Sequence, residues 1–165
     1  MTPARPGSPA PAFDVSLVGG GFRGLADLVE PGGGALVFFK STCRTCRLVL
    51  PRLIPLAQAV EREERLFLAV AQEDEAAARA TRDEWGLAYR VAWEAEPYVV
   101  SAAYGITTVP TLLLVDGAGI VAERLEGFAK AEYIALGAAA EQALALGDAP
   151  AILERPDELP NVKPG

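Results

Sequence analysis

The sequence contains no histidine among its 165 residues. Without histidine the chain cannot form Cys–His or Ser–His–Asp nucleophile pairs, an HExxH zinc site, or histidine-ligated haem or copper. Cysteine is almost as rare, because Cys43 and Cys46 are the only two. Two cysteines cannot supply a four-cysteine zinc or iron–sulfur site, and they do not make a disulfide-rich scaffold. We therefore expect no metal and no cofactor, and the available chemistry is that of one CxxC pair.

The chain also lacks an excess of positive charge and any long apolar run. It has 15 Lys and Arg residues against 22 Asp and Glu residues, a formal net charge of −7, so nucleic acid phosphates would repel it. No stretch reaches the roughly 18 apolar residues of a transmembrane helix, and residues 1–12 lack the apolar run of a secretory signal. We predict a cytoplasmic protein with no nucleic-acid or membrane partner. A trimmed extracytoplasmic form that carries a new Met1 is the alternative.

Proline divides the chain into three parts. Eight of the 13 prolines lie near the two ends of the sequence. We therefore predict a Pro-rich N-terminal arm over 1–11, one folded domain over 12–147, and a Pro-rich C-terminal tail over 148–165. The length suits a single domain with a sizeable core.

Strand and helix patterns alternate within the predicted domain. Short apolar or alternating runs predict strands, and Ala-rich or amphipathic runs predict helices. The expected strands are 13–17, 35–39, 66–71, 111–115 and 120–126, and the expected helices are 25–29, 44–64, 73–85, 96–103 and 130–146. This order predicts an α/β fold with a central mixed β-sheet flanked by helices on both faces.

The pair Cys43 and Cys46 stands where the apolar run ALVFF ends and a predicted helix begins. A helix N-terminus offers free N–H groups and a dipole that favour an anionic sulfur. The thiolate is the nucleophile of thiol–disulfide exchange, so Cys43 is the candidate attacking residue and Cys46, one turn later, the candidate resolving residue. An inert buried pair, or half of an incomplete metal site, is the weaker alternative.

The charge around this pair is positive although the whole chain is acidic. Residues 31–60 contain Lys40, Arg44, Arg47 and Arg52 and no acidic residue. Nearby positive charge favours a thiolate, so Lys40 and Arg44 are the candidates that tune the pKa of Cys43. For Arg47 and Arg52, a solvated helix face is the simpler interpretation.

A second motif, YGITTVPT, precedes the predicted strand 111–115. With the CxxC pair, with Pro51 on the following helix, and with the turn DGAGI at 116–120, it makes residues 8–146 resemble the thioredoxin superfamily. The resemblance is strongest to the TlpA/ResA-like, redoxin-type thiol–disulfide oxidoreductases. It implies a thioredoxin-like fold whose opening segment, SPAPAFDVSLVGG, forms an N-terminal hairpin extension.

The resemblance also implies the parts of an active site. It makes Val109–Pro110 a cis peptide that faces the CxxC pair, and it makes the chain a thiol–disulfide oxidoreductase with Cys43 as nucleophile. The implied partners are protein or small-molecule thiols and disulfides, together with a thiol reductant or oxidant. The residues that would contact the substrate are Thr42, Arg44, Thr45, Val109 and Pro110.

Several positions depart from the family pattern. Thr42 replaces the usual Trp, which should widen access to Cys43. Val37 and Val49 stand where relatives have an acid that accepts the proton of the resolving cysteine. Lys40 or Glu96 are weak substitutes for that role. The Arg-Thr dipeptide between the cysteines should make the disulfide more oxidising than that of thioredoxin.

Two other functions remain open at this stage. A peroxiredoxin-like thiol peroxidase would oxidise Cys43 to a sulfenic acid, but Lys40 and Leu36 stand where its Thr and Pro would be. A redox-sensing thioredoxin-fold protein is the other alternative. The aromatic residues of 85–98 are expected to close the edge of the core, and a substrate-facing lid is the functional alternative: Trp85, Tyr89, Trp93 and Tyr98.

Overall fold

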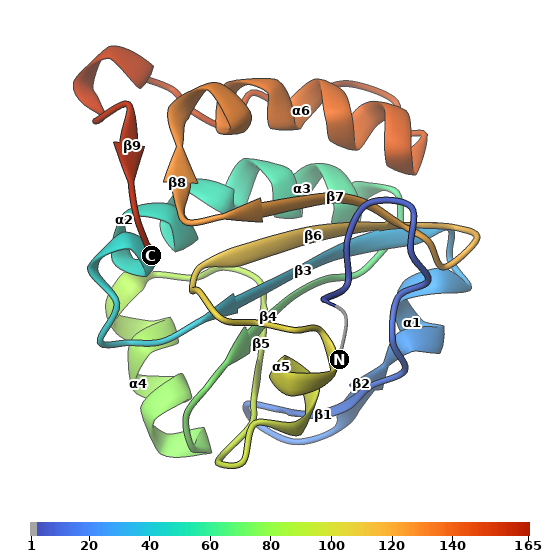
Figure 1. Cartoon of the computed structure of the whole chain (residues 1–165), viewed down its shortest axis with the longest axis vertical. Coiled ribbons are helices and arrows are strands. Elements are labelled where there is room, and N and C mark those ends of the chain that lie inside the picture. Colours follow the sequence, from blue (N-terminus) through green and yellow to red (C-terminus); the bar gives the residue numbers. More distant parts are fainter. Residues whose placement is uncertain (1–2) are drawn as a thin grey trace.

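A seven-stranded mixed sheet forms the centre of the structure, a computed structural model that describes residues 3–165 (Figure 1). The strand order is β2-β1-β5-β4-β3-β6-β7. The three central strands β5, β4 and β3 run parallel, and every other neighbour is antiparallel. Their bounds are β1 Asp14–Leu17, β2 Phe22–Gly24, β3 Gly33–Phe39, β4 Phe67–Ala71, β5 Arg90–Trp93, β6 Thr111–Asp116 and β7 Val121–Glu126.

The central strand β3 shows why both faces of the sheet are covered. All seven of its residues are buried, as expected of an apolar strand flanked by helices on both sides. Ala35, Val37 and Phe39 face one core cluster, whereas Leu36 and Phe38 face the other. The predicted mixed sheet with helices on both faces is confirmed.

Helices α3, α4 and α6 pack on the first cluster, and α1 and α5 pack on the second. In Figure 1, α3 and α6 lie together above the sheet. The bounds of the helices are α1 Leu25–Val29, α2 Arg44–Val49, η1 Leu50–Leu53, α3 Ile54–Arg62, α4 Glu75–Trp85, α5 Val99–Ala103, α6 Lys130–Leu144 and η2 Pro156–Glu158, where η marks a 3₁₀ turn.

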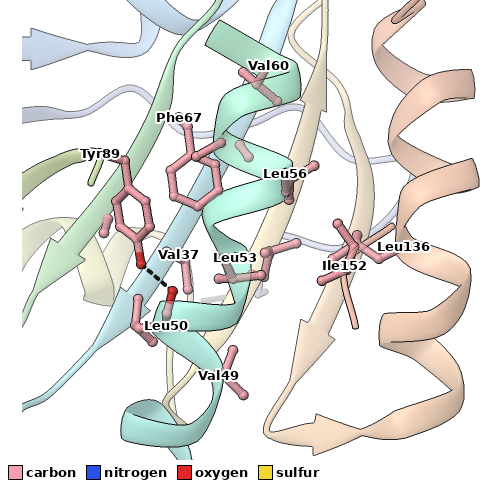
Figure 2. Packing of buried hydrophobic residues seen from close by; sticks show 14 of the residues in the cluster. Val37, Val49, Leu50, Leu53, Leu56, Val60, Phe67, Tyr89, Leu136 and Ile152 are labelled. Atoms are coloured by element: carbon pink, nitrogen blue, oxygen red, sulfur yellow. Dashed lines mark hydrogen bonds between the residues drawn. The ribbon is translucent and has the colours of Figure 1, made fainter. Parts of the chain in front are cut away.

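The single helix predicted over 44–64 is wrong in one respect, because it is divided into α2, η1 and α3. Pro51 and Pro55 stand at the starts of η1 and α3. A proline has no N–H to donate and its ring crowds the preceding turn, so the helix tightens into a 3₁₀ turn there. The Tyr89 hydroxyl donates to the carbonyl oxygen of Leu50 in this turn at 2.6 Å (Figure 2).

The N-terminal hairpin that the resemblance implies is present, formed by β1 and β2, whereas β5 is not among the expected strands. The aromatic residues of 85–98 are expected to close the edge of the core, and the structure places β5 among them, paired with both β4 and β1. The aromatic side chains around it serve the core, since Tyr89 is buried and the Trp85 ring lies 6.0 Å from the Phe39 ring. Tyr98 is the exception, because it lies beside Lys40.

Both ends of the chain pack on the domain. In the N-terminal arm, the Gly7 N–H donates to Val121 at 2.8 Å, while Met1 and Thr2 lie outside the described residues. At the other end, Ile152 packs beside Leu136 of α6 (Figure 2). The chain then returns along α6, and β9 (Val162–Lys163) pairs antiparallel with β8 (Phe128–Ala129).

Candidate active site

The CxxC pair stands at the carboxyl end of β3, where the chain turns into α2. Cys43 has extended backbone angles, φ −90° and ψ 115°, and serves as the N-cap of α2. The backbone N–H of Cys46 donates to the Cys43 sulfur at 3.1 Å. Both cysteines are free thiols. A sulfur that accepts an N–H at a helix N-terminus lies where negative charge is stabilised.

The two thiols differ in their exposure to solvent. Cys43 is half-buried, whereas Cys46 is completely buried in the first core cluster. Burial raises the pKa of the Cys46 thiol, and its hydrogen-bonded neighbour Cys43 raises it further. An incoming disulfide can therefore meet only the Cys43 sulfur, while Cys46 is held protonated behind it.

The loop before β6 faces this pair. The Val109–Pro110 peptide bond is cis, and the Cys43 thiol donates to the Val109 carbonyl oxygen at 3.4 Å. Two hydrogen bonds hold the loop: the Gly127 N–H donates to Pro110 at 2.8 Å, and the Thr111 hydroxyl donates to Thr108 at 2.6 Å. The structure thus brings Val109 and Pro110 to Cys43 from 66 residues along the chain.

The positive residues are spread around the rim of the site. Lys40 lies 5.2 Å from the centre of the Tyr98 ring. Arg44 is exposed, and Arg47 is paired with Glu84 at 3.5 Å on the surface. A cavity of about 360 Å³ opens between Lys40, Tyr98 and Val109. It reaches Val109, whose carbonyl oxygen accepts the Cys43 thiol, but Cys43 itself is not part of its lining.

The two threonines next to the cysteines, Thr42 and Thr45, differ in their exposure and contacts. Thr42 is exposed, as expected of a residue that leaves Cys43 accessible. Thr45 is buried, and its hydroxyl donates to the Pro164 carbonyl oxygen at 2.6 Å. The sequence indicated Thr45 as a substrate contact, but nothing in its pattern indicated that Pro164 would lie on it.

Within the described part of the chain, no acidic residue takes the place of the missing proton acceptor. The groups that shift the pKa of Cys46 are its burial, Cys43 and backbone amides. Glu96 is exposed on the loop before α5. Among residues 3–165 no cluster of three or more Asp, Glu, Cys or His side chains is placed to hold a metal ion.

Arg124 supports the loop and was not found from the sequence. Its side chain is 8% exposed. Its guanidinium donates to the carbonyl oxygens of Ala4, Tyr104 and Gly105 at 2.7–3.1 Å. It thereby ties the N-terminal arm to the segment that leads into Val109. A lone arginine on an alternating strand carries no signal of such a role.

Comparison with solved structures shows the same fold in several bacterial proteins. A candidate protein disulfide isomerase from Bacteroides thetaiotaomicron is 20% identical, with a TM-score of 0.77 over 86% of this chain and 91% of that one. A candidate thiol:disulfide interchange protein DsbE from Chlorobium tepidum is 24% identical, with a TM-score of 0.76 over 87% and 99%. A thioredoxin family thiol:disulfide interchange protein from Chlorobium tepidum TLS is 23% identical, with a TM-score of 0.68 over 87% and 99%. These likenesses establish the thioredoxin-like fold.

The fold and the dithiol pair define the class of the protein, a thioredoxin-type thiol–disulfide oxidoreductase. The sequence matches the AhpC/TSA family over residues 6–124, and the chain belongs to that family. No curated protein sequence gives a significant match. Within the described residues, no helix has the length and apolar character to cross a membrane. The cytoplasmic location stays a prediction.

Proposed function

We propose that the protein exchanges disulfides with thiol-containing substrates, with Cys43 as the attacking and Cys46 as the resolving residue. The observation that carries the proposal is the contrast between the two sulfurs. The Cys43 sulfur is accessible and accepts an N–H at a helix N-terminus, whereas Cys46 is buried one turn behind it. This arrangement gives each sulfur one role in a two-step exchange.

The reaction proceeds through a mixed disulfide. The Cys43 thiolate attacks one sulfur of a substrate disulfide, the substrate S–S bond breaks, and the departing thiolate takes a proton from solvent. Cys46 then loses its proton and attacks the Cys43 sulfur, which expels the second substrate thiol. The substrate gains two electrons and the protein ends with a Cys43–Cys46 disulfide. A thiol reductant restores the pair, and the reverse sequence oxidises a dithiol.

The remaining residues of the site orient the substrate. The backbone of Val109, beside Pro110, lies against the Cys43 sulfur and can pair with an extended substrate. Thr42 and Arg44 are exposed at the entrance. The Thr45 hydroxyl is free to bind a substrate only when its bond to the Pro164 carbonyl oxygen opens, and Lys40 provides a positive charge beside the cavity.

Trapping tests the assignment of roles. A Cys46→Ser variant should accumulate a mixed disulfide on Cys43 when it is mixed with glutathione disulfide, detected as a mass increase by intact-protein mass spectrometry. The matched Cys43→Ser variant should accumulate none, because Cys46 is buried. Equal trapping in both variants, or none in either, would contradict the proposed roles.

Redox titration separates exchange from peroxide reduction. We expect the pair to equilibrate with glutathione buffers at a reduction potential above the value of about −270 mV for thioredoxin, since Arg44 stands between the cysteines. A pair that stays as two thiols in every mixture would refute the proposal. Peroxidase activity predicts instead that Cys43 reacts faster with hydrogen peroxide than with glutathione disulfide in stopped-flow measurements.

A further inference from the structure

Residues 160–165 return to the active site and are held there as an added strand. β9 pairs with β8, and the backbone N–H of Lys130 donates to the Asn161 carbonyl oxygen at 2.8 Å. The Lys130 ammonium group donates to the carbonyl oxygens of Pro156 and Leu159 at 2.9 and 3.2 Å. The β8–β9 pairing and the bond to Asn161 are main-chain contacts of the kind that hold an extended peptide beside a strand, whereas the ammonium group holds the residues just before the segment.

The end of this segment lies on both elements that frame Cys43. The Pro164 carbonyl oxygen accepts a hydrogen bond from Thr45, between the two cysteines, at 2.6 Å. Gly165 lies so close to the Val109 carbonyl group that a Cβ atom at position 165 would overlap it. The same carbonyl oxygen accepts the Cys43 thiol. The segment therefore bridges the CxxC helix and the loop beside it (Figure 1).

The segment can leave this position without opening the core. All its residues except Lys163 are exposed, and Lys163 is half-buried. The residues that precede it are anchored separately, because Ile152 is buried in the first core cluster and Leu159 packs against that cluster. Little apolar area is buried by its seating, so a competing strand has only a small free energy to overcome.

We propose that residues 160–165 are an internal occupant of the polypeptide-binding groove beside Cys43. A disulfide carried on an extended polypeptide reacts only after this segment has left, whereas a small disulfide reacts with the segment in place. Cys43 is only half-buried with the segment in place, and the cavity beside Lys40 and Val109 is lined by no residue of the segment, so a small disulfide can still reach the Cys43 sulfur. This inference rests on the proposed thiol–disulfide exchange.

Two full-length variants release the segment by different means. In Gly165→Val, the new side chain collides with Val109. In Lys163→Pro, β9 loses a backbone N–H. The matched control is Ala149→Val, which introduces the same side chain at an exposed position before the segment. Release is measured independently by hydrogen exchange of the Lys130 amide, whose partner is the Asn161 carbonyl oxygen.

Each reduced protein is then mixed with two substrates, glutathione disulfide and a disulfide-linked dimer of an unstructured ten-residue peptide. Loss of one hydrogen bond changes such an opening equilibrium about fivefold. Both variants should exchange the Lys130 amide and reduce the peptide dimer about fivefold faster or more, by matching factors. The rate with glutathione disulfide should be unchanged in every variant.

Three outcomes decide the matter. A peptide rate that stays constant while the Lys130 amide exchanges faster would overturn the inference and leave the proposed function intact. If neither variant raises the exchange rate of the Lys130 amide, the inference is overturned as well, because the contacts of Gly165 and β9 would then not hold the segment. If the unaltered protein reduces neither substrate, the proposed function itself fails.

Discussion

The buried position of Cys46 predicts how the second step of exchange depends on pH. A thiol attacks only as its thiolate. Burial raises the pKa of Cys46 above the ordinary value of about 8.5, so its thiolate is scarce at neutral pH. Because the described residues supply no carboxylate that acts on Cys46, hydroxide or buffer must take the proton. The resolving step should therefore follow the thiolate fraction.

The size of the effect follows from this shift. An ordinary thiol is about 3% ionised at pH 7, and its rate would rise roughly 200-fold from pH 6 to pH 9 before it levels off. With the pKa raised by burial, the thiolate fraction stays far below saturation over this range. The rate should rise about tenfold for each pH unit, or about 1000-fold in total, without levelling at pH 8.5.

Reaction with 5,5′-dithiobis(2-nitrobenzoic acid) resolves the two steps by absorbance. The attack of Cys43 releases one coloured thiolate, and the attack of Cys46 on the mixed disulfide releases the second. The Cys46→Ser variant identifies the second phase, because only that phase should disappear. A second phase that levels off by pH 8.5, or that does not depend on pH, would refute the reasoning that burial suppresses the Cys46 thiolate.

Three further predictions concern stability. Tyr89→Phe should lower the free energy of unfolding by about 1–2 kcal/mol, because a buried carbonyl loses its donor; urea denaturation checks this against Tyr98→Phe, which should change little. Leu53→Ala should cost about 2–5 kcal/mol in the same assay, since it empties a fully buried position. Burial raises the pKa of both Tyr104 and Tyr133. The contribution of these two neutral phenols to the free energy of unfolding is therefore complete below the tyrosine pKa of the unfolded chain, about 10. Above pH 10 the free energy of unfolding should fall by about 1.4 kcal/mol per pH unit for each of the two tyrosines, because only the unfolded chain ionises there. A urea midpoint that stays constant from pH 9 to pH 11.5 would contradict this expectation.

The parts of the fold that the sequence predicted well are those with local causes. The apolar runs of β3 and β4 are buried on both faces, and such runs are distinctive in a single sequence. Cys43 follows directly from the end of β3, so its place at a helix N-terminus was also predictable. The division of the following helix was harder to predict. Pro51 marks one break, but a proline near the start of a helix is often tolerated, so its presence does not by itself indicate a break.

Features that depend on distant partners could not be predicted in this way. β5 has only four residues, and its pairing with β4 and β1 is what makes it a strand. The contact between Thr45 and Pro164 joins residues that are 119 positions apart. The proline content predicts a tail over 148–165, but it does not indicate the surface on which that tail lies.

The positive charges around Cys43 act on the approach of substrates more than on stability. The pair between Arg47 and Glu84 is largely exposed, and such surface pairs contribute about 0–1 kcal/mol. The electric field of these positive charges nevertheless extends over about 8 Å at physiological salt, which covers the entrance to the site. Lys40 lies beside the cavity next to Val109, and Arg44 is exposed between the cysteines. Both residues belong to the domain and not to the segment, so this field acts on glutathione disulfide and on a peptide disulfide alike, whether or not the segment is seated.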